Sequence, residues 1–191
     1  SWQTPRFIFG IPSARRGRRP ASKSKRLYRN RSGTWSQSNA ASDSNTVVYP
    51  SLVHLKSVAI VSDPVNGTSN PKFIPGAIAD YTLRITNTGQ GTVGLDALVL
   101  EDPIPANSEL FVGDLGGAGS GPVAFTNGSP GSALTWTYSS LLPLPVDDLF
   151  FYNGTTWDYQ PSGTYDPNVT QIRLSPKGRM AANTGSGSPY F

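Results

Sequence analysis

Few residues in this 191-residue chain are of the types that perform chemistry in proteins. It has no cysteine and one histidine, His54, which excludes thiol nucleophiles, most metal sites and the usual catalytic triads. Two acid pairs, Glu101-Asp102 and Asp147-Asp148, make poor general acid–base pairs because neighbouring strand residues point to opposite faces. Asp102, Asp147 and Asp148 are also only weak calcium candidates, since no EF-hand or repeat-type spacing surrounds them. The sequence therefore predicts a protein that is not an enzyme and uses no cofactor or dedicated metal.

A glycine-rich stretch over residues 113–121 invites comparison with a phosphate-binding loop. Such a loop needs a helix behind it and a Lys-Ser or Lys-Thr end, and neither is present in the sequence. We therefore expect a flexible connection.

Charge is distributed very unevenly along the chain. Residues 1–31 contain ten basic residues and no acidic one, which gives this arm a formal charge of +10. The other six basic residues and all 12 acidic residues lie in residues 32–191, whose formal charge is −6. A basic run of this kind repels itself and buries little, so we expect residues 1–45 to form a flexible arm and linker. Its cationic side chains include Arg15, Arg16, Arg18, Arg19, Lys23, Lys25, Arg26, Arg29 and Arg31.

One short segment of the arm differs from the rest. Phe7, Phe9 and Ile11 alternate at period two around Ile8 and Gly10, as a strand laid on an apolar groove would.

The composition of the chain changes at residue 46. Short β-branched and apolar runs, several of them alternating, are separated by Pro-Gly, Asn-Gly and Asp-Pro turn signals. The runs cover residues 46–49, 53–61, 79–87, 95–100, 109–112, 123–125, 134–138, 149–152, 155–159 and 169–174. No amphipathic helix of three turns and no apolar run of about 18 residues appears. The pattern predicts an all-β domain over residues 46–191, an Ig-like or jelly-roll-like antiparallel sandwich with no membrane span.

Two segments of this domain carry a family resemblance. Residues 72–89 read Lys-Phe-Ile-Pro-Gly-Ala-Ile-Ala-Asp-Tyr-Thr-Leu-Arg-Ile-Thr-Asn-Thr-Gly, and residues 98–107 read Leu-Val-Leu-Glu-Asp-Pro-Ile-Pro-Ala-Asn. This pattern resembles the prokaryotic surface-protein conserved repeat domain, known as domain of unknown function eleven, over about residues 50–180. The resemblance implies an Ig-like β-sandwich of secreted or surface-anchored bacterial and archaeal proteins, with no assigned catalytic residues.

The chain departs from that pattern at both ends. The basic arm is not part of it, and residues 189–191 stand where a closing strand is expected to begin. Two alternatives stay open: the chain is trimmed here, or the sandwich is one strand short.

A sandwich that lacks a strand suggests a function. Its open edge and groove can take a strand from another subunit, and Phe7, Ile8, Phe9 and Ile11 have the alternation of such a donor. We therefore expect an extracellular or cell-surface structural subunit that assembles with copies of itself into a filament. Two alternatives remain: the arginine-rich arm binds nucleic acid or another polyanion, as in coat proteins, or the chain is a monomeric surface adhesion module.

Overall fold

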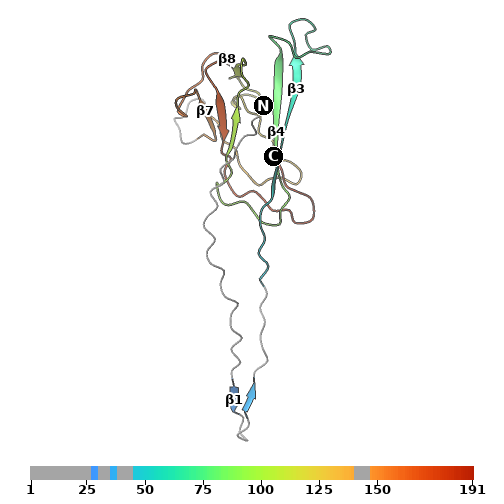
Figure 1. Cartoon of the computed structure of the whole chain (residues 1–191), viewed down its shortest axis with the longest axis vertical. Coiled ribbons are helices and arrows are strands. Elements are labelled where there is room, and N and C mark those ends of the chain that lie inside the picture. The colour runs from blue at the N-terminus through green and yellow to red at the C-terminus, as the bar shows by residue number, and fades with distance from the viewer. Residues whose placement is uncertain (1–26, 30–34, 38–44, 140–146) are drawn as a thin grey trace, which may run out of the picture. The chain divides into compact units, whose positions relative to one another are not determined.

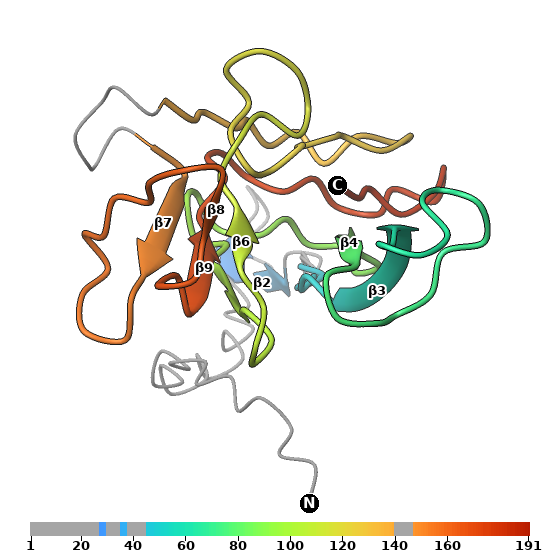
Figure 2. The same ribbon diagram turned by 90° about the horizontal axis from the view of Figure 1, so that it is seen from above.

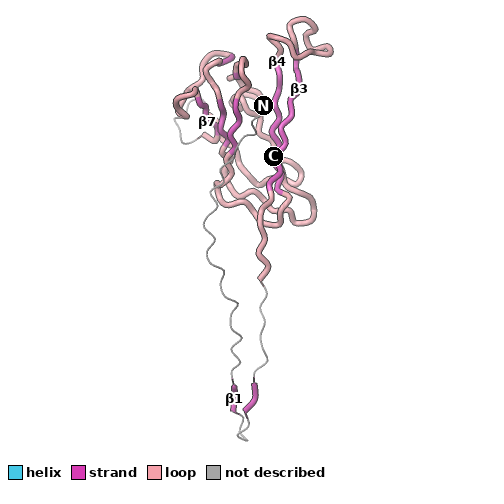
Figure 3. Tube along the Cα trace, viewed as in Figure 1, coloured by secondary structure: helices cyan, strands magenta, loops and turns pink. Residues whose placement is uncertain are grey.

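The computed structural model describes residues 27–29, 35–37, 45–139 and 147–191. The chain divides into two compact units, residues 1–46 and residues 47–191. Every element in the described residues is a strand or a turn, and none is a helix (Figure 1, Figure 3). The paired strands are all antiparallel. The predicted all-β class and antiparallel pairing are confirmed. A search of the described residues for a helix long and apolar enough to cross a membrane found none.

The first unit contains a short hairpin that the sequence did not predict. Strand β1 (Leu27–Arg29) pairs with β2 (Trp35–Gln37), and Leu27 lies opposite Gln37. Tyr28 and Trp35 favour strands, although the segment around them is otherwise polar and basic.

A long two-stranded ribbon begins the second unit. Strand β3 (Leu52–Ser62) runs antiparallel to β4 (Ile78–Asn87), from the pair Leu52–Asn87 to the pair Ile60–Ala79. The two strands lie side by side along their length (Figure 1). Both were predicted from their β-branched and alternating sequences, and both occur within one or two residues of the expected bounds.

A second sheet lies on the opposite side of this unit (Figure 2). Its three strands, β5 (Leu100–Pro103), β9 (Gln171–Leu174) and β7 (Leu149–Tyr152), stand in the order β5-β9-β7. Beside it, β6 (Leu110–Phe111) pairs with β8 (Tyr165–Asp166).

Five of the expected strands differ from the structure. Residues 46–49 and 123–125 lie in no strand, and residues 155–159 make one isolated bridge, in which Asp158 pairs in parallel with Phe151.

The other two expected strands have clear backbone causes. Residues 95–99 are not a strand, because Asp96 has a positive φ of 51° and Ala97 donates to the Gly94 carbonyl, which turns the chain just before β5. Residues 134–138 make one isolated bridge, in which Thr135 and Lys177 exchange both backbone hydrogen bonds. Ser175, which would be the next hydrogen-bonded partner of Thr137, donates its N–H to the Asp148 carbonyl instead, and Gly178 has a φ of +108°, so the facing segment does not continue the ladder.

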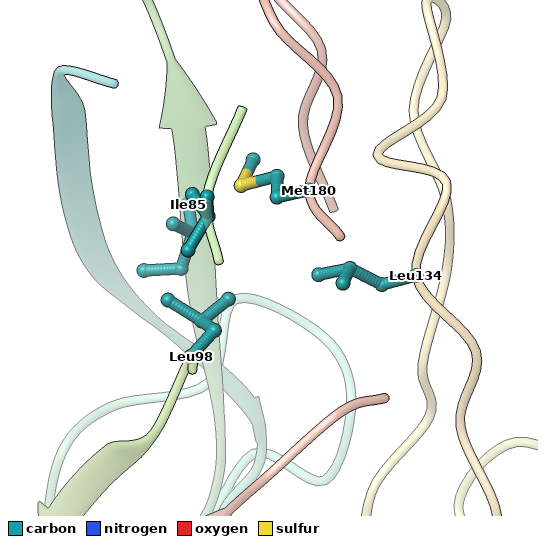
Figure 4. Packing of buried hydrophobic residues seen from close by; sticks show 5 residues of the cluster. Ile85, Leu98, Leu134 and Met180 are labelled. Carbon is teal, nitrogen blue, oxygen red and sulfur yellow. The ribbon is translucent and has the colours of Figure 1, made fainter. Parts of the chain in front are cut away.

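The core consists of two clusters of buried side chains. The first joins β4 to the loops around it, with Leu134 and Met180 directed toward Ile85 and Leu98 (Figure 4). The second lies under the three-stranded sheet and contains Leu149, Phe151, Val169, Ile172 and Leu174. Leu100 packs against both clusters and links them.

Candidate assembly site

One edge of β4 is covered over only part of its length. The edge that faces away from β3 meets the C-terminal segment: the N–H of Ile85 donates to the Phe191 carbonyl at 3.0 Å, and the N–H of Phe191 donates back at 3.2 Å. The N–H of Asn87 donates to the Pro189 carbonyl at 3.0 Å. Residues 85 and 87 therefore direct their backbone polar groups away from β3.

The alternation of a strand extends this arrangement to the rest of β4. The N–H and C=O groups of Ala79, Tyr81 and Leu83 point to the same side as those of Ile85. Within the described part of the chain, no backbone group hydrogen-bonds to them there, because β4 belongs to a two-stranded sheet and its other contacts stop at Ile85. We call residues 79–83 on this side the acceptor edge.

The side chains along the acceptor edge are half covered. Ala79, Tyr81 and Leu83 lie on the same face of the ribbon as Ile85, the buried residue of the first core cluster. Leu83 packs against the second cluster, whereas Tyr81 is 42% exposed and its cross-strand neighbour Val58 is 53% exposed. The apolar face is thus closed near the core and open toward the far end of the ribbon.

Exposed apolar side chains also occur on the other face of β3. Val53 and Leu55 are exposed there, opposite Thr86 and Arg84 of β4. A ribbon of two strands is marginally stable in water by itself, and contiguous exposed apolar surface marks an interaction site. Both properties make the ribbon a candidate interaction surface.

A buried carboxylate closes the loop at the far end of the ribbon. Asp63 Oδ1 accepts from the N–H groups of Val65 at 2.7 Å and Asn66 at 2.6 Å, and Oδ2 accepts from the Asn66 side chain at 2.9 Å and the Lys72 N–H at 2.5 Å. The hydrogen bond from the Asn66 side chain, followed by that from its backbone, holds the pKa of Asp63 well below its usual range. Asp63 therefore stays ionised and fixes the loop between β3 and β4.

An asparagine fixes the opposite end. The Asn87 side chain is fully buried, and its Oδ1 accepts from the N–H groups of Ser51 at 3.0 Å and Gly89 at 3.1 Å. Its Nδ2 donates to the carbonyls of Gly91 at 2.9 Å and Ala181 at 2.8 Å. A Cβ on Gly89 would lie 2.4 Å from the Ser51 nitrogen, so the close approach of these segments requires glycine. The amide thus ties β3, β4 and the C-terminal segment together.

An ion pair holds the middle of the ribbon. Lys56 Nζ lies 2.6 and 2.8 Å from the two carboxylate oxygens of Asp102 on β5, and 4.9 Å from the centre of the Tyr81 ring. Asp102, a weak calcium candidate in the sequence, therefore serves here to join the ribbon to the second sheet.

The other two calcium candidates act within the fold as well. Asp147 Oδ1 accepts from the Ser139 N–H at 2.7 Å, and burial is the largest effect that raises its pKa. Asp148 Oδ2 accepts from the Thr137 N–H at 2.7 Å, and its Oδ1 lies 3.6 Å from Lys177 Nζ. The described residues contain no group of three or more His, Cys, Asp or Glu side chains that could hold a metal ion.

The predicted donor and most of the cationic arm lie outside the described residues. These are Phe7, Ile8, Phe9, Ile11, Arg15, Arg16, Arg18, Arg19, Lys23, Lys25, Arg26 and Arg31. Arg29 lies in β1, where the structure describes its backbone pairing with Trp35. The structure therefore shows an edge of β4 that no described residue pairs, which the sequence did not locate, and the donor segment stays a prediction.

Comparisons of the chain with models of protein families, with curated proteins and with solved structures found no match.

Proposed function

We propose that this chain is a non-enzymatic, extracellular structural subunit that assembles into a filament at the cell surface. In this proposal, residues 47–191 form an Ig-like sandwich that is short of a strand, and the N-terminal arm of a neighbouring copy supplies it. The observation that carries the proposal is the acceptor edge of β4, where backbone groups that no described residue pairs lie above a half-exposed apolar face.

Edge strands of this kind are usually protected. Proteins shorten them, place lysine or proline on them, or cover them, because an open edge pairs with other chains. Strand β4 has ten residues, and its edge-facing positions 79, 81 and 83 are Ala, Tyr and Leu. An added strand would complete the backbone hydrogen bonds and cover Tyr81, which is the physical basis of strand addition between proteins.

Charge favours association between copies. The arm has a formal charge of +10 and the rest of the chain −6, so the arm of one copy is attracted to the body of another. Because donor and acceptor are different surfaces, the contact is head-to-tail, and such a contact produces a filament when it does not close into a ring. The surface location rests on the family resemblance of residues 72–89 and 98–107.

The charge of the arm also supports a second candidate function. Arginine-rich arms neutralise phosphates, so binding of nucleic acid or another surface polyanion would use the same residues. That binding would weaken steeply as salt is raised, whereas a docked apolar strand is much less sensitive to salt.

Electron microscopy of the full chain beside a version that lacks residues 1–45 tests the proposal. We expect filaments from the full chain and dispersed particles from the shortened one, with circular dichroism showing that both are folded. Dispersed monomers in both samples would contradict assembly and direct attention to polyanion binding, measured across a salt series.

A further inference from the structure

We infer that residues 7–11 of a second copy lie antiparallel along the acceptor edge, with Phe7 opposite Leu83, Phe9 opposite Tyr81 and Ile11 opposite Ala79. This inference rests on the proposed function, and it adds the edge, the direction and the register of the donor.

The C-terminal segment of the chain itself shows how a strand binds this edge. Ile85 and Phe191 exchange two backbone hydrogen bonds, and the Phe191 side chain packs against the first core cluster and stacks on Phe125 with ring centres 5.2 Å apart. Leu83, Tyr81 and Ala79 are the next positions along β4 whose backbone N–H and C=O groups also point away from β3. A five-residue donor spans roughly 17 Å, which is the length of residues 79–83. The donor therefore continues the row of side chains that Phe191 begins.

The alternation of the donor selects its register. A residue opposite Leu83, Tyr81 or Ala79 shares their face of the sheet, which is the face toward the core. Phe7, Phe9 and Ile11 meet all three positions at once and leave Ile8 and Gly10 on the outer face. A slip by one residue would bring Ile8 and Gly10 inward and expose the two phenylalanines.

Charges select the direction. Arg15, Arg16, Arg18 and Arg19 follow the donor, and an antiparallel donor carries them past Ala79 toward the exposed Asp80 and the ionised Asp63. A parallel donor would instead carry these four arginines toward Arg84, at the end of the edge where the charge of Lys56 is neutralised by Asp102. The antiparallel arrangement sets Arg6 across from Arg84, whose guanidinium stacks on the Tyr190 ring at 3.7 Å. The single opposed pair of Arg6 and Arg84 weakens binding less than the approach of four arginines to acidic side chains strengthens it, so the antiparallel direction is preferred.

Disulfide trapping between two full-length chains tests the register directly. One chain carries Ile8→Cys and the other, isotope-labelled to mark its mass, carries Thr82→Cys; the protein has no cysteine of its own. Residues 8 and 82 would form a non-hydrogen-bonded pair with Cα atoms about 4.5 Å apart, within disulfide range. Both lie on the outer face, so the apolar contacts are kept. We expect the mixed dimer to form at least about tenfold faster than with Asp80→Cys or Thr86→Cys in the second chain.

Other trapping results would overturn the register, the donation by a second copy, or the proposed function. Equal rates at the three positions, or a preference for Asp80→Cys or Thr86→Cys, would overturn the register. A chain carrying both Ile8→Cys and Thr82→Cys that closes only on itself, as a monomer, would overturn donation by a second copy. Filaments that depend on residues 1–45 but give no trapping at Thr82→Cys would overturn this docking and leave the proposed function standing. Absence of such filaments would remove both.

Discussion

Replacing Phe7 and Phe9 by aspartate in the same chain is expected to abolish filaments and leave residues 47–191 folded. Burial of each phenylalanine contributes about 1.5–3 kcal/mol, and the new carboxylates would enter an apolar face. The loss of about 3–6 kcal/mol corresponds to roughly two to four powers of ten in affinity. Negative-stain electron microscopy measures assembly, and circular dichroism confirms that the body is folded.

Two control variants separate the apolar contacts from charge and chain composition. Phe7→Leu with Phe9→Leu keeps apolar side chains at both positions and should still assemble, with shorter filaments. Gln3→Asp with Ile8→Asp adds the same two negative charges to the arm without changing an inward-facing residue, and should also assemble. Filaments of normal length from Phe7→Asp with Phe9→Asp would rule out this segment as the donor.

Replacement of Asn87 by alanine is expected to have the largest effect on stability. The change removes four hydrogen bonds and leaves the N–H groups of Ser51 and Gly89 and the carbonyls of Gly91 and Ala181 without the partner they now have. We expect the free energy of unfolding of the body to fall by about 3–5 kcal/mol, because unsatisfied buried polar groups carry their full desolvation cost. Urea denaturation followed by tryptophan fluorescence measures this change.

Gln90→Ala is the matched control for that variant. Gln90 lies in the same turn and is exposed, so removing its amide should change the free energy of unfolding by less than about 0.5 kcal/mol. A loss below about 1 kcal/mol for Asn87→Ala would show that the three joined segments hold together without this amide.

The sequence predicted strand β4 best, because one face of it is exposed to solvent and the other packs toward the core. Ala79, Tyr81, Leu83 and Ile85 alternate with polar residues, and this period-two pattern located β4 because its polar face is exposed. A different signal located β7: residues 149–152 are a continuous apolar run followed by an Asn-Gly turn signal.

Prediction failed where backbone geometry overrides side-chain preference. The apolar residues 95–100 resemble a strand, but the left-handed turn at Asp96 delays its start to Leu100. Residues 134–138 have strand-like composition, yet the facing segment makes one bridge, because Ser175 pairs with Asp148 instead and Gly178 has a positive φ. The order β5-β9-β7 was equally inaccessible, since it depends on contacts between distant segments.

In the candidate site, too, one part could be proposed from the sequence and the other could not. Its donor side is a local pattern, the alternation of residues 7–11, and can be proposed from sequence. Its acceptor side is the absence of a neighbour along residues 79–83 in the described chain, and this depends on which distant segments of the fold pair with β4. No property of residues 79–83 alone distinguishes an open edge from a covered one.

Chain termination tests strand donation between copies most directly. A body that lacks residues 1–45 keeps the acceptor edge but has no donor, so it can end a growing filament and cannot extend it. Titrating this body, checked for folding, into the full chain and measuring filament length by electron microscopy gives the answer. We predict that mean length falls steadily as the fraction of shortened chains rises. Filaments of unchanged length at equal amounts of the two proteins would contradict assembly by donation of the N-terminal strand.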